Sequence, residues 1–347
     1  MTLNYIGSKK KLIPFIDHVI SSNTEPKSTL GDLFAGTGIV GEFFFKKGFN
    51  IISNDKEKYS YVINYATLKS SYTDNIKEQI DILNKLDGIE GLIYNNYSSK
   101  ANRLFFTDEN AKKADAIRNK IDELKKNNII NEDEYYFLLA SLIQSLDKVA
   151  NTTSVYGAFL KKLKKSAQKL LILKPIHTIE KNENKNKIFN KDILEIDEKI
   201  DIIYLDPPYV ARQYGANYCP LNFLVEYNSE IKLKGVSGLY DYYKSPFASK
   251  AKAKKAFENM FKLLTTKSDK IFLSYNNQGI LSTEEIIDIM KIYGSVTTYK
   301  YSYKKYQATK QNGGKTKEYI HYLNCDKKFK IKEIDIIKDE KNILKEK

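Results

Sequence analysis

The stretch LGDLFAGTGIVG, residues 30–41, joins a short apolar run to three closely spaced glycines. Leu30 to Phe34 is typical of a buried strand, and the glycines match G-x-G-x-x-G at the start of a helical run through Lys47. In open α/β sheets such a strand, loop and helix bring the backbone close to a nucleotide cofactor, because glycine has no side chain to hold it away. The stretch predicts a doubly wound α/β fold with a cofactor site at the carboxyl end of its first strand.

Two acidic residues near the glycines indicate the kind of cofactor. A second strand-like run, Phe49 to Ser53, leads to Asp55, where a carboxylate can accept both hydroxyls of a ribose. Asp32, just ahead of the glycines, would repel a pyrophosphate but suits a ligand that carries an ammonium and a sulfonium. S-adenosylmethionine therefore fits better than NAD, and an NAD-dependent oxidoreductase is the more distant alternative.

A second motif, Asp206-Pro207-Pro208-Tyr209, directly follows the apolar run 201–205. It puts a carboxylate, a rigid carbonyl and an aromatic ring at the carboxyl end of a predicted strand, where open sheets bind ligands. Asp206 and the Pro207 carbonyl can accept both N–H groups of an exocyclic amine such as adenine N6, which favours the pyramidal amine that attacks a methyl group. Tyr209 can stack on the base. Cytosine N4 offers the same amine chemistry and stays open as an alternative.

With both motifs in view, the chain resembles the Dam-like, alpha-group DNA adenine N6 methyltransferases of bacterial restriction-modification systems. It follows their motif order from residue 4 to residue 277, and cytosine N4 enzymes usually have Ser in place of Asp206. The resemblance implies direct methyl transfer, without a metal, to a flipped-out adenine, with S-adenosylhomocysteine as the product. It also implies that residues 272–277 brace the catalytic motif. The catalytic residues it implies are Asp206, Pro207, Pro208 and Tyr209. The cofactor residues it implies are Tyr5, Gly7, Ser8, Lys9, Asp32, Phe34, Ala35, Gly36, Thr37, Gly38, Asp55, Asp192 and Ile193.

The region between Asp55 and Asp192 has helical patterns. Residues 74–86 have apolar residues at helical spacing, Thr107 is placed to cap a charged helix, and Asn131 is placed to cap a helix with one apolar stripe. In the resembling family this position often holds the target-recognition region. We therefore expect a mostly helical insertion that contacts DNA.

Basic and polar side chains at three places are candidates for DNA contacts, since lysine, arginine and amide side chains bind phosphate oxygens. They follow a hydroxyl-rich stretch at 151–157, follow the catalytic motif, or lie at the tip of a C-terminal hairpin. Solvated faces or edge-strand protection would explain the same residues without DNA. The candidates are Lys161, Lys162, Lys164, Lys165, Arg212, Tyr214, Asn217, Lys304 and Lys305.

The composition agrees with a polyanionic partner. The chain has 57 Lys and Arg against 43 Asp and Glu, a net charge of +14 over 347 residues. A Lys-rich coding bias would give the same charge. Two distant cysteines and three unpatterned histidines predict neither a disulfide framework nor a metal site, and Cys219-Pro220 reverses the Pro-Cys order of cytosine C5 methyltransferases. With neither an apolar span nor a signal-peptide pattern, we expect a cytoplasmic protein, associated with the nucleoid through DNA.

These observations predict a Rossmann-like methyltransferase sheet that ends in an antiparallel hairpin strand. Residues 1–60 and 185–325 would form the catalytic domain, residues 61–184 the helical DNA-recognition region, and residues 326–347 a charged tail without assigned function. The tail has isoleucines at helical spacing. The predicted partners are double-stranded DNA and a restriction endonuclease acting on the same site. Besides cytosine N4 methylation, an RNA substrate and a catalytically dead fold that only binds nucleic acid remain as alternatives.

Overall fold

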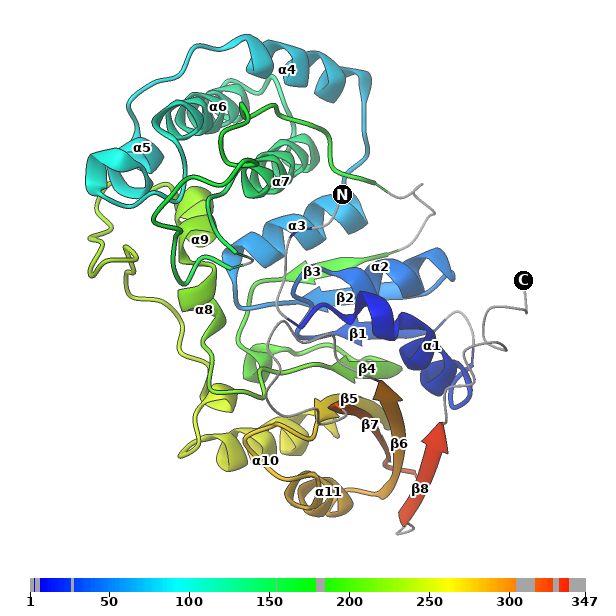
Figure 1. Cartoon of the computed structure of the whole chain (residues 1–347). Coiled ribbons are helices and arrows are strands. Elements are labelled where there is room, and N and C mark those ends of the chain that lie inside the picture. The colour runs from blue at the N-terminus through cyan, green and yellow to red at the C-terminus, as the bar shows by residue number, and fades with distance from the viewer. Residues whose placement is uncertain are drawn as a thin grey trace.

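A single mixed sheet forms the centre of the computed structural model, which describes residues 3, 7–25, 28–153, 155–178, 185–303, 316–326 and 331–336. Its strand order is β3-β2-β1-β4-β5-β7-β6-β8 (Figure 1). All neighbours pair in parallel except β7, which is antiparallel to both β5 and β6. The strands are β1 (Thr29–Asp32), β2 (Asn50–Asn54), β3 (Lys187–Phe189), β4 (Ile202–Leu205), β5 (Lys270–Asn276), β6 (Ser295–Tyr303), β7 (Thr316–Asn324) and β8 (Ile331–Ile336). The predicted doubly wound fold with a terminal antiparallel strand is confirmed.

Helices cover both faces of this sheet. On β4, Ile202 and Tyr204 pack with α1 and α2, whereas Ile203 and Leu205 pack with α10 and α11. Because both faces are covered, every residue of β4 is buried and the strand reads as a continuous apolar run. The helices are α1 (Ile13–Ser21), α2 (Ile39–Lys46), α3 (Lys58–Lys69), α4 (Asp74–Lys85), α5 (Leu92–Tyr97), α6 (Asp108–Lys126), α7 (Glu132–Lys148), α8 (Tyr214–Asn217), α9 (Cys219–Glu226), α10 (Ala253–Leu264) and α11 (Thr283–Lys291), and the short 3₁₀ turns are η1 (Lys9–Leu12), η2 (Ser99–Ala101), η3 (Ile193–Glu195) and η4 (Pro246–Ala248).

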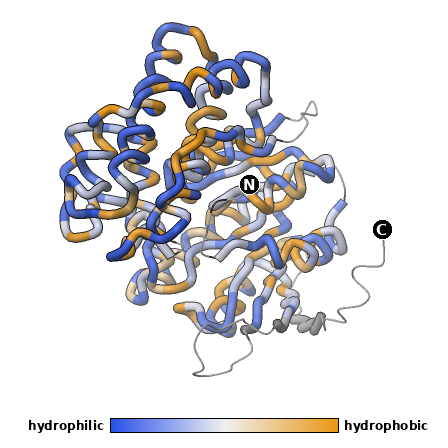
Figure 2. Tube along the Cα trace, turned by 45° about the horizontal axis from the view of Figure 1, so that its top comes forward, coloured by the Kyte–Doolittle hydropathy of each residue, from blue (hydrophilic) through white to orange (hydrophobic). Residues whose placement is uncertain are grey.

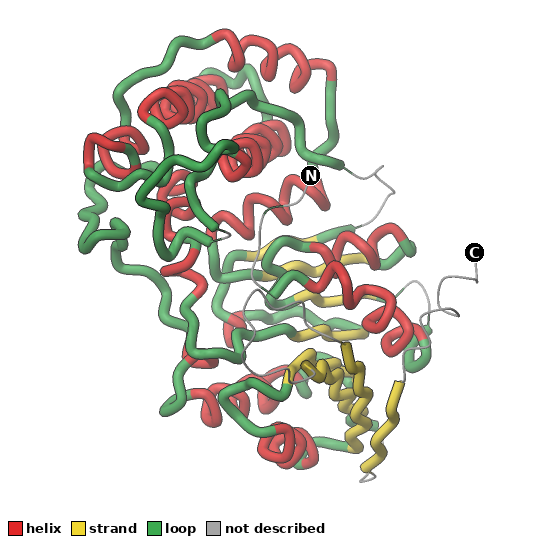
Figure 3. The backbone as a smooth tube through the Cα atoms, in the orientation of Figure 1, coloured by secondary structure: helices red, strands yellow, loops and turns green. Residues whose placement is uncertain are grey.

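Apart from the side chains packed on the two faces of the sheet, a separate hydrophobic core lies among helices α3 to α7 and α9. Figure 3 shows these helices to one side of the strands. This core draws on Leu3 and on two longer stretches of chain, roughly residues 59–176 and residues 214–240. The predicted caps are confirmed, since Thr107 accepts the N–H of Asn110 and Asn131 forms a capping box with Glu134. Hydrophobic residues alternate with hydrophilic ones along these helices, as expected for helices that bury one face (Figure 2).

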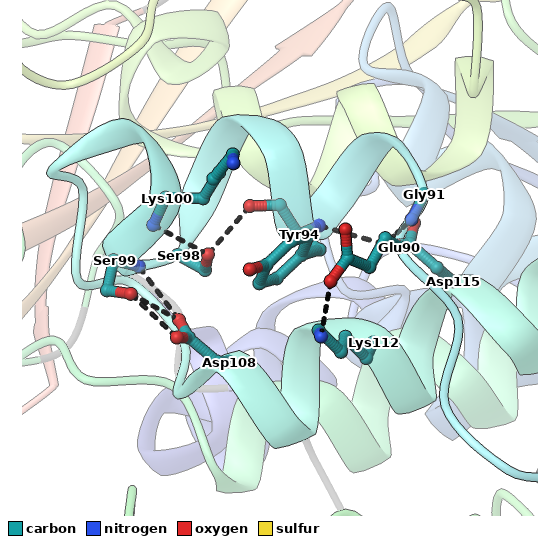
Figure 4. A network of polar contacts seen from close by, with 9 residues as sticks. All are labelled: Glu90, Gly91, Tyr94, Ser98, Ser99, Lys100, Asp108, Lys112 and Asp115. Carbon is teal, nitrogen blue, oxygen red and sulfur yellow. Dashed lines mark hydrogen bonds and ion pairs between the residues drawn. The ribbon is translucent and has the colours of Figure 1, made fainter.

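A polar network fixes the outer helices of this region (Figure 4). The carboxylate of Asp115 on α6 accepts the N–H groups of Gly91, Ile93 and Tyr94, which satisfies the free donors at the start of α5. One turn earlier on α6, Lys112 pairs with Glu90 at 2.7 Å. Side chains of α6 therefore hold the short helix α5 in position.

The C-terminal strand β8 differs from the sequence-based interpretation of the tail. Its isoleucine spacing is helical, but residues 331–336 form a strand that pairs in parallel with β6 from Val296 to Tyr301. Pairing satisfies the backbone groups along the open side of β6, and this tertiary contact outweighs the local pattern. Ile337 lies outside the described residues.

Within the described parts of the chain, no helix is both long and apolar enough to span a membrane.

Candidate active site

A pocket of about 890 Å³, open on one side, lies at the carboxyl ends of β1 and β4. The strand order reverses at this point. On one side of β1 lie β2 and then β3, and on its other side lie β4 and then β5. This is where open α/β sheets bind their ligands. The pocket brings together predicted residues from distant parts of the chain. These are Gly7, Ser8, Lys9, Asp32, Phe34, Ala35, Gly36, Thr37, Asp55, Asp192, Ile193, Asp206, Pro208 and Tyr214. Tyr5 lies outside the described residues.

The glycine loop needs its glycines. Gly36 and Gly38 have φ angles of 53° and 75°, in the left-handed region that other residues avoid. A Cβ atom on Gly38 would also collide with the amide oxygen of Asn64. Asn64 and Ser60 on α3 in turn donate hydrogen bonds to the carbonyl of Gly36. The loop is therefore held from α3, and Gly38 supports the pocket without lining it.

Asp55, directly after β2, is bound to the glycine loop. One carboxylate oxygen accepts the N–H of Gly36 at 2.7 Å and the other the N–H of Glu57 at 2.9 Å. Burial raises the pKa of Asp55, and these N–H groups oppose that rise. Glu57, which the motif analysis missed, also lines the pocket, and burial raises its pKa to about 7. Two carboxyl groups therefore lie side by side at the end of β2.

Asp32, the last residue of β1, is buried with a relative exposure of 1% and accepts the N–H of Gly41 at 3.0 Å. Burial raises the pKa of Asp32 to about 7, and the nearby Asp206 and Asp55 add to the rise. The Asp32 carboxyl group therefore holds its proton more tightly than an exposed aspartate does.

Asp206, at the end of β4, faces Lys9. The Nζ atom of Lys9 lies 3.0 Å from Oδ1 of Asp206, and both side chains are largely buried. Burial is the largest single influence on the pKa of Lys9 and lowers it, but Asp206, with smaller contributions from Tyr209, Tyr204 and Glu318, more than offsets burial, so the pKa is raised well above its ordinary value. Burial likewise raises the pKa of Asp206, against the pull of Lys9. Lys9 is therefore a cation held against the carboxylate of the second motif, although the family resemblance assigns it to the cofactor.

Tyr209 is braced by the end of β5 and by the residues that follow it. Its ring packs edge-on against Tyr275 at 5.5 Å, and its carbonyl accepts the N–H of Ile280. Its hydroxyl lies 3.5 Å from Nζ of Lys9. The prediction that residues 272–277 support the second motif is confirmed by the Tyr275 contact.

A segment without any recognised motif closes the far side of the pocket. Tyr243 donates a hydrogen bond to Asp192, which also caps η3, and Phe247 packs edge-on against Phe34. Gln213 is joined to the backbone of Ser245 by two hydrogen bonds. The sequence places Gln213 in the stretch expected to border the base pocket, but it gives no such indication for Tyr243, Ser245 and Phe247, where the local signal is the tyrosine-rich run at 240–243.

The basic residues after Thr152 belong to a loop that contacts α8. Tyr156 donates its N–H to the carbonyl of Asn217, which ties this loop to α8 just after the second motif. Lys161, Lys162, Lys165 and Arg212 are exposed. Lys164 differs, because its Nζ donates to the carbonyl of Thr152 at 2.5 Å. Lys304 and Lys305 lie outside the described residues.

The remaining reactive side chains are structural. Cys219 is buried in the helical core, and burial raises the pKa of its thiol to about 11, which argues against a thiolate nucleophile. His321 is buried on β7 beside Thr298, and burial lowers its pKa to about 4. Among the described residues, no three His, Cys, Asp or Glu side chains are grouped to hold a metal ion.

The pocket suits a cationic ligand with an aromatic part. Five carboxyl groups line it, from Asp32, Asp55, Glu57, Asp192 and Asp206, and Phe34 and Phe247 add an apolar wall. Buried carboxyl groups in such number repel one another and a pyrophosphate, whereas a bound cation would stabilise their ionised forms. This donor set fits S-adenosylmethionine and does not fit NAD.

Comparison with known proteins agrees with this geometry. The chain is 41% identical over 336 residues to "Type II methyltransferase M.NlaIII" of Neisseria lactamica, covering 92% of this chain and 99% of that protein. It is 38% identical over 327 residues to "Type II methyltransferase M.CviAII" of Paramecium bursaria Chlorella virus 1, covering 92% and 98%. It also matches "Modification methylase StsI" of Streptococcus sanguinis at 37% identity, covering 92% of this chain and 51% of that longer protein.

A family model described as D12 class N6 adenine-specific DNA methyltransferase matches residues 5–289, most of the chain. The family expected from the motif order is confirmed, and cytosine N4 methylation and hydride transfer are not favoured. The chain belongs to the D12 class of N6 adenine-specific DNA methyltransferases.

Proposed function

We propose that Asp206 and the carbonyl of Pro207 hold the amine of the target adenine while it is methylated. The main support is that Asp206 ends β4 inside the same pocket that the glycine loop of β1 borders. An amine bound at Asp206 would thus meet whatever the glycine loop holds. Two acceptors favour a pyramidal nitrogen with an available lone pair, and such preorganised contacts contribute most to the rate when they strengthen in the transition state.

The enzyme uses S-adenosylmethionine, as its family does. When bound, this cofactor supplies an electrophilic methyl group on a sulfonium. We propose that Asp32 accepts its ammonium, that Asp55 accepts its ribose hydroxyls, and that Phe34, Ile193 and Phe247 surround its adenine. Asp192 would act mainly through Tyr243, since its carboxylate already accepts that hydroxyl. We further propose that the reaction needs no metal.

The target adenine would leave the DNA helix to reach Asp206, since a stacked base cannot enter a pocket at the edge of a sheet. Tyr209 would then stack on it. Its ring packs against Tyr275 and its backbone carbonyl accepts the Ile280 N–H, so little side-chain freedom would be lost when a base arrives.

DNA would bind over the open side of the pocket. Lys161, Lys162 and Lys165 are exposed, and their loop is hydrogen-bonded to α8 through Tyr156. We propose that these lysines and Arg212 neutralise phosphates. Helices α4 to α7 would then contribute to recognition of the sequence.

We also propose that the enzyme is the modification partner of a restriction endonuclease that cuts the same site. This rests on the relatives named as Type II methyltransferases and modification methylases, two of which this chain matches over nearly their full length.

Sequencing of methylated bases in DNA from cells that express the enzyme tests the function as a whole. We expect N6-methyladenine at one position of one short sequence, and DNA from the same cells to resist any nuclease that cuts that sequence. Methyl groups on cytosine N4, or scattered over unrelated adenines, would reject the proposal. Cells that express the Asp206→Ala variant are the control.

A further inference from the structure

Lys9 separates two cavities. One is the pocket described above, and the other lies beyond η1 and is bordered by Lys9, Tyr209, Tyr301 and Glu318. Tyr209 borders only this second cavity, although Asp206 and Pro208 of the same motif border the first. The Lys9 ammonium thus stands where the acceptor of the target amine and the proposed stacking face meet.

The position of Lys9 conflicts with the proposed use of Asp206. Its ammonium lies 3.0 Å from Asp206 Oδ1, so it competes with the adenine amine for that oxygen. As the amine nitrogen forms its new bond it also gains positive charge, and an ammonium beside it would oppose that change. Lys9 must therefore move from Asp206 or slow the reaction. As a buried cation it needs another anion when it moves.

Glu318 is a buried carboxylate that borders the same second cavity as Lys9. It has a relative exposure of 5% and lies on β7, in register with Asn276 of β5 and Tyr301 of β6. Its charge acts on both Lys9 and Tyr209. β7 therefore places a second negative charge at the cavity that Lys9 borders, in addition to Asp206.

We propose that Glu318 is a positioning residue, which receives the Lys9 ammonium when the target amine takes its place at Asp206. The inference rests on the proposed role of Asp206 in holding that amine. The Lys9 charge then stays paired throughout, and Asp206 is freed only when a base arrives. When no base is bound, the ammonium of Lys9 keeps the carboxylate of Asp206 ionised, so that it can accept the target amine.

The proposal is tested by measuring two steps separately, the flipping of the target base and the transfer of the methyl group. Glu318→Gln removes the charge at nearly constant shape, and Asp326→Asn, an exposed position just beyond β7, is the matched control. We expect Glu318→Gln to slow single-turnover methylation at least tenfold, with cofactor affinity within twofold of the parent. We also expect the same fluorescence rise from 2-aminopurine at the target position. Asp326→Asn should match the parent in all three measurements.

The dependence on Lys9 distinguishes this role from simple support of the fold. In a Lys9→Met background, Glu318→Gln should add no more than a twofold loss, because no ammonium remains to be received. An equal tenfold loss in both backgrounds, or no loss in the parent background, would overturn the role of Glu318.

Two further variants keep the test independent of folding and of the proposed function. Glu318→Met removes the charge without leaving a buried polar group, and it replaces Glu318→Gln in the test if Glu318→Gln folds poorly. Glu318→Met should then show the same tenfold loss of the single-turnover rate. A fully active Glu318→Met variant would refute the proposal. If the Asp206→Ala variant still methylates adenine, the proposed role of Asp206 is rejected, and the inference with it. Loss of methylation in Asp206→Ala with a fully active Glu318→Gln would reject the inference alone.

Discussion

The carboxylate of Asp55 accepts the backbone N–H of Gly36 across 2.7 Å, so the acid proposed to bind ribose also shapes the glycine loop. Asp55→Ala should weaken S-adenosylmethionine binding by at least about 1.5–3 kcal/mol, the cost of a hydrogen bond to a charged group. Because the Gly36 and Glu57 N–H groups lose their acceptor as well, thermal stability should also fall. Calorimetry and thermal unfolding measure the two effects. Asp81→Ala, the same change at an exposed helical position, should alter neither.

Asp206→Ala should lower the single-turnover rate about a hundredfold or more, as expected when a preorganised polar group that stabilises the transition state is removed. It should also lower stability, since Lys9 would be buried without this partner. The double variant Lys9→Met with Asp206→Ala should recover much of the stability while staying slow. A stable double variant that methylates at the parent rate would show that Asp206 acts only through Lys9.

Gly38→Ala should cost more stability than Gly48→Ala. Both glycines have positive φ angles, 75° and 90°, and a left-handed alanine costs about 1–2 kcal/mol. A Cβ at Gly48 meets nothing within 4 Å, but at Gly38 it collides with Asn64. We expect the Gly38 variant to lose a further 1–3 kcal/mol or so by overpacking. Urea unfolding compares the two. Equal losses would mean that Asn64 moves aside freely.

Stability and cofactor binding should respond to pH in opposite directions. Burial raises the pKa of Asp32 and Glu57 to about 7, so the folded protein binds their protons more tightly than the unfolded chain. Without cofactor, the free energy of unfolding should thus fall as pH rises from about 4 to 7, by up to about 1.4 kcal/mol per unit for each group. Cofactor affinity should rise over the same range, because the ammonium prefers an ionised Asp32. In Asp32→Asn both slopes should become shallower, and slopes equal to the parent's would refute the assignment.

The affinity for DNA should fall steeply with salt, as neutralised phosphates release counterions. Changing Lys161, Lys162 and Lys165 to Gln should reduce the slope of log K against log salt by about 0.9 for each phosphate that is no longer neutralised, without changing the methylated sequence. Lys164 is omitted because its ammonium already binds Thr152. The same change at the exposed Lys250, Lys252 and Lys254 should leave the slope unchanged, and the opposite result would move the DNA to that side.

The sequence predicted those features that are determined locally. The glycine loop requires glycine because its backbone is left-handed, and β4 is recognisable because a strand covered on both faces has only apolar residues. Long-range contacts gave no such signal. The pairing of Lys9 with Asp206 joins residues 197 positions apart, and Tyr243 reaches Asp192 only because the chain returns from the helical core. The strand β8 was missed for the same reason, since the free edge of β6, and not the spacing of its isoleucines, determines its form.

The helical core is built mainly from two stretches of chain, residues 59–176 and 214–240, and the motif from Asp206 to Tyr209 lies between them in sequence. The side chains of Tyr218 and Phe223 are as deeply buried in that core as those of Phe105 and Phe137. A chimaera that received only the first stretch from a relative would combine two halves of a core that did not evolve together. If the helical region reads the DNA sequence, as proposed, exchange of site preference between members of this class calls for a paired transplant, in which α8 and α9 travel with α4 to α7.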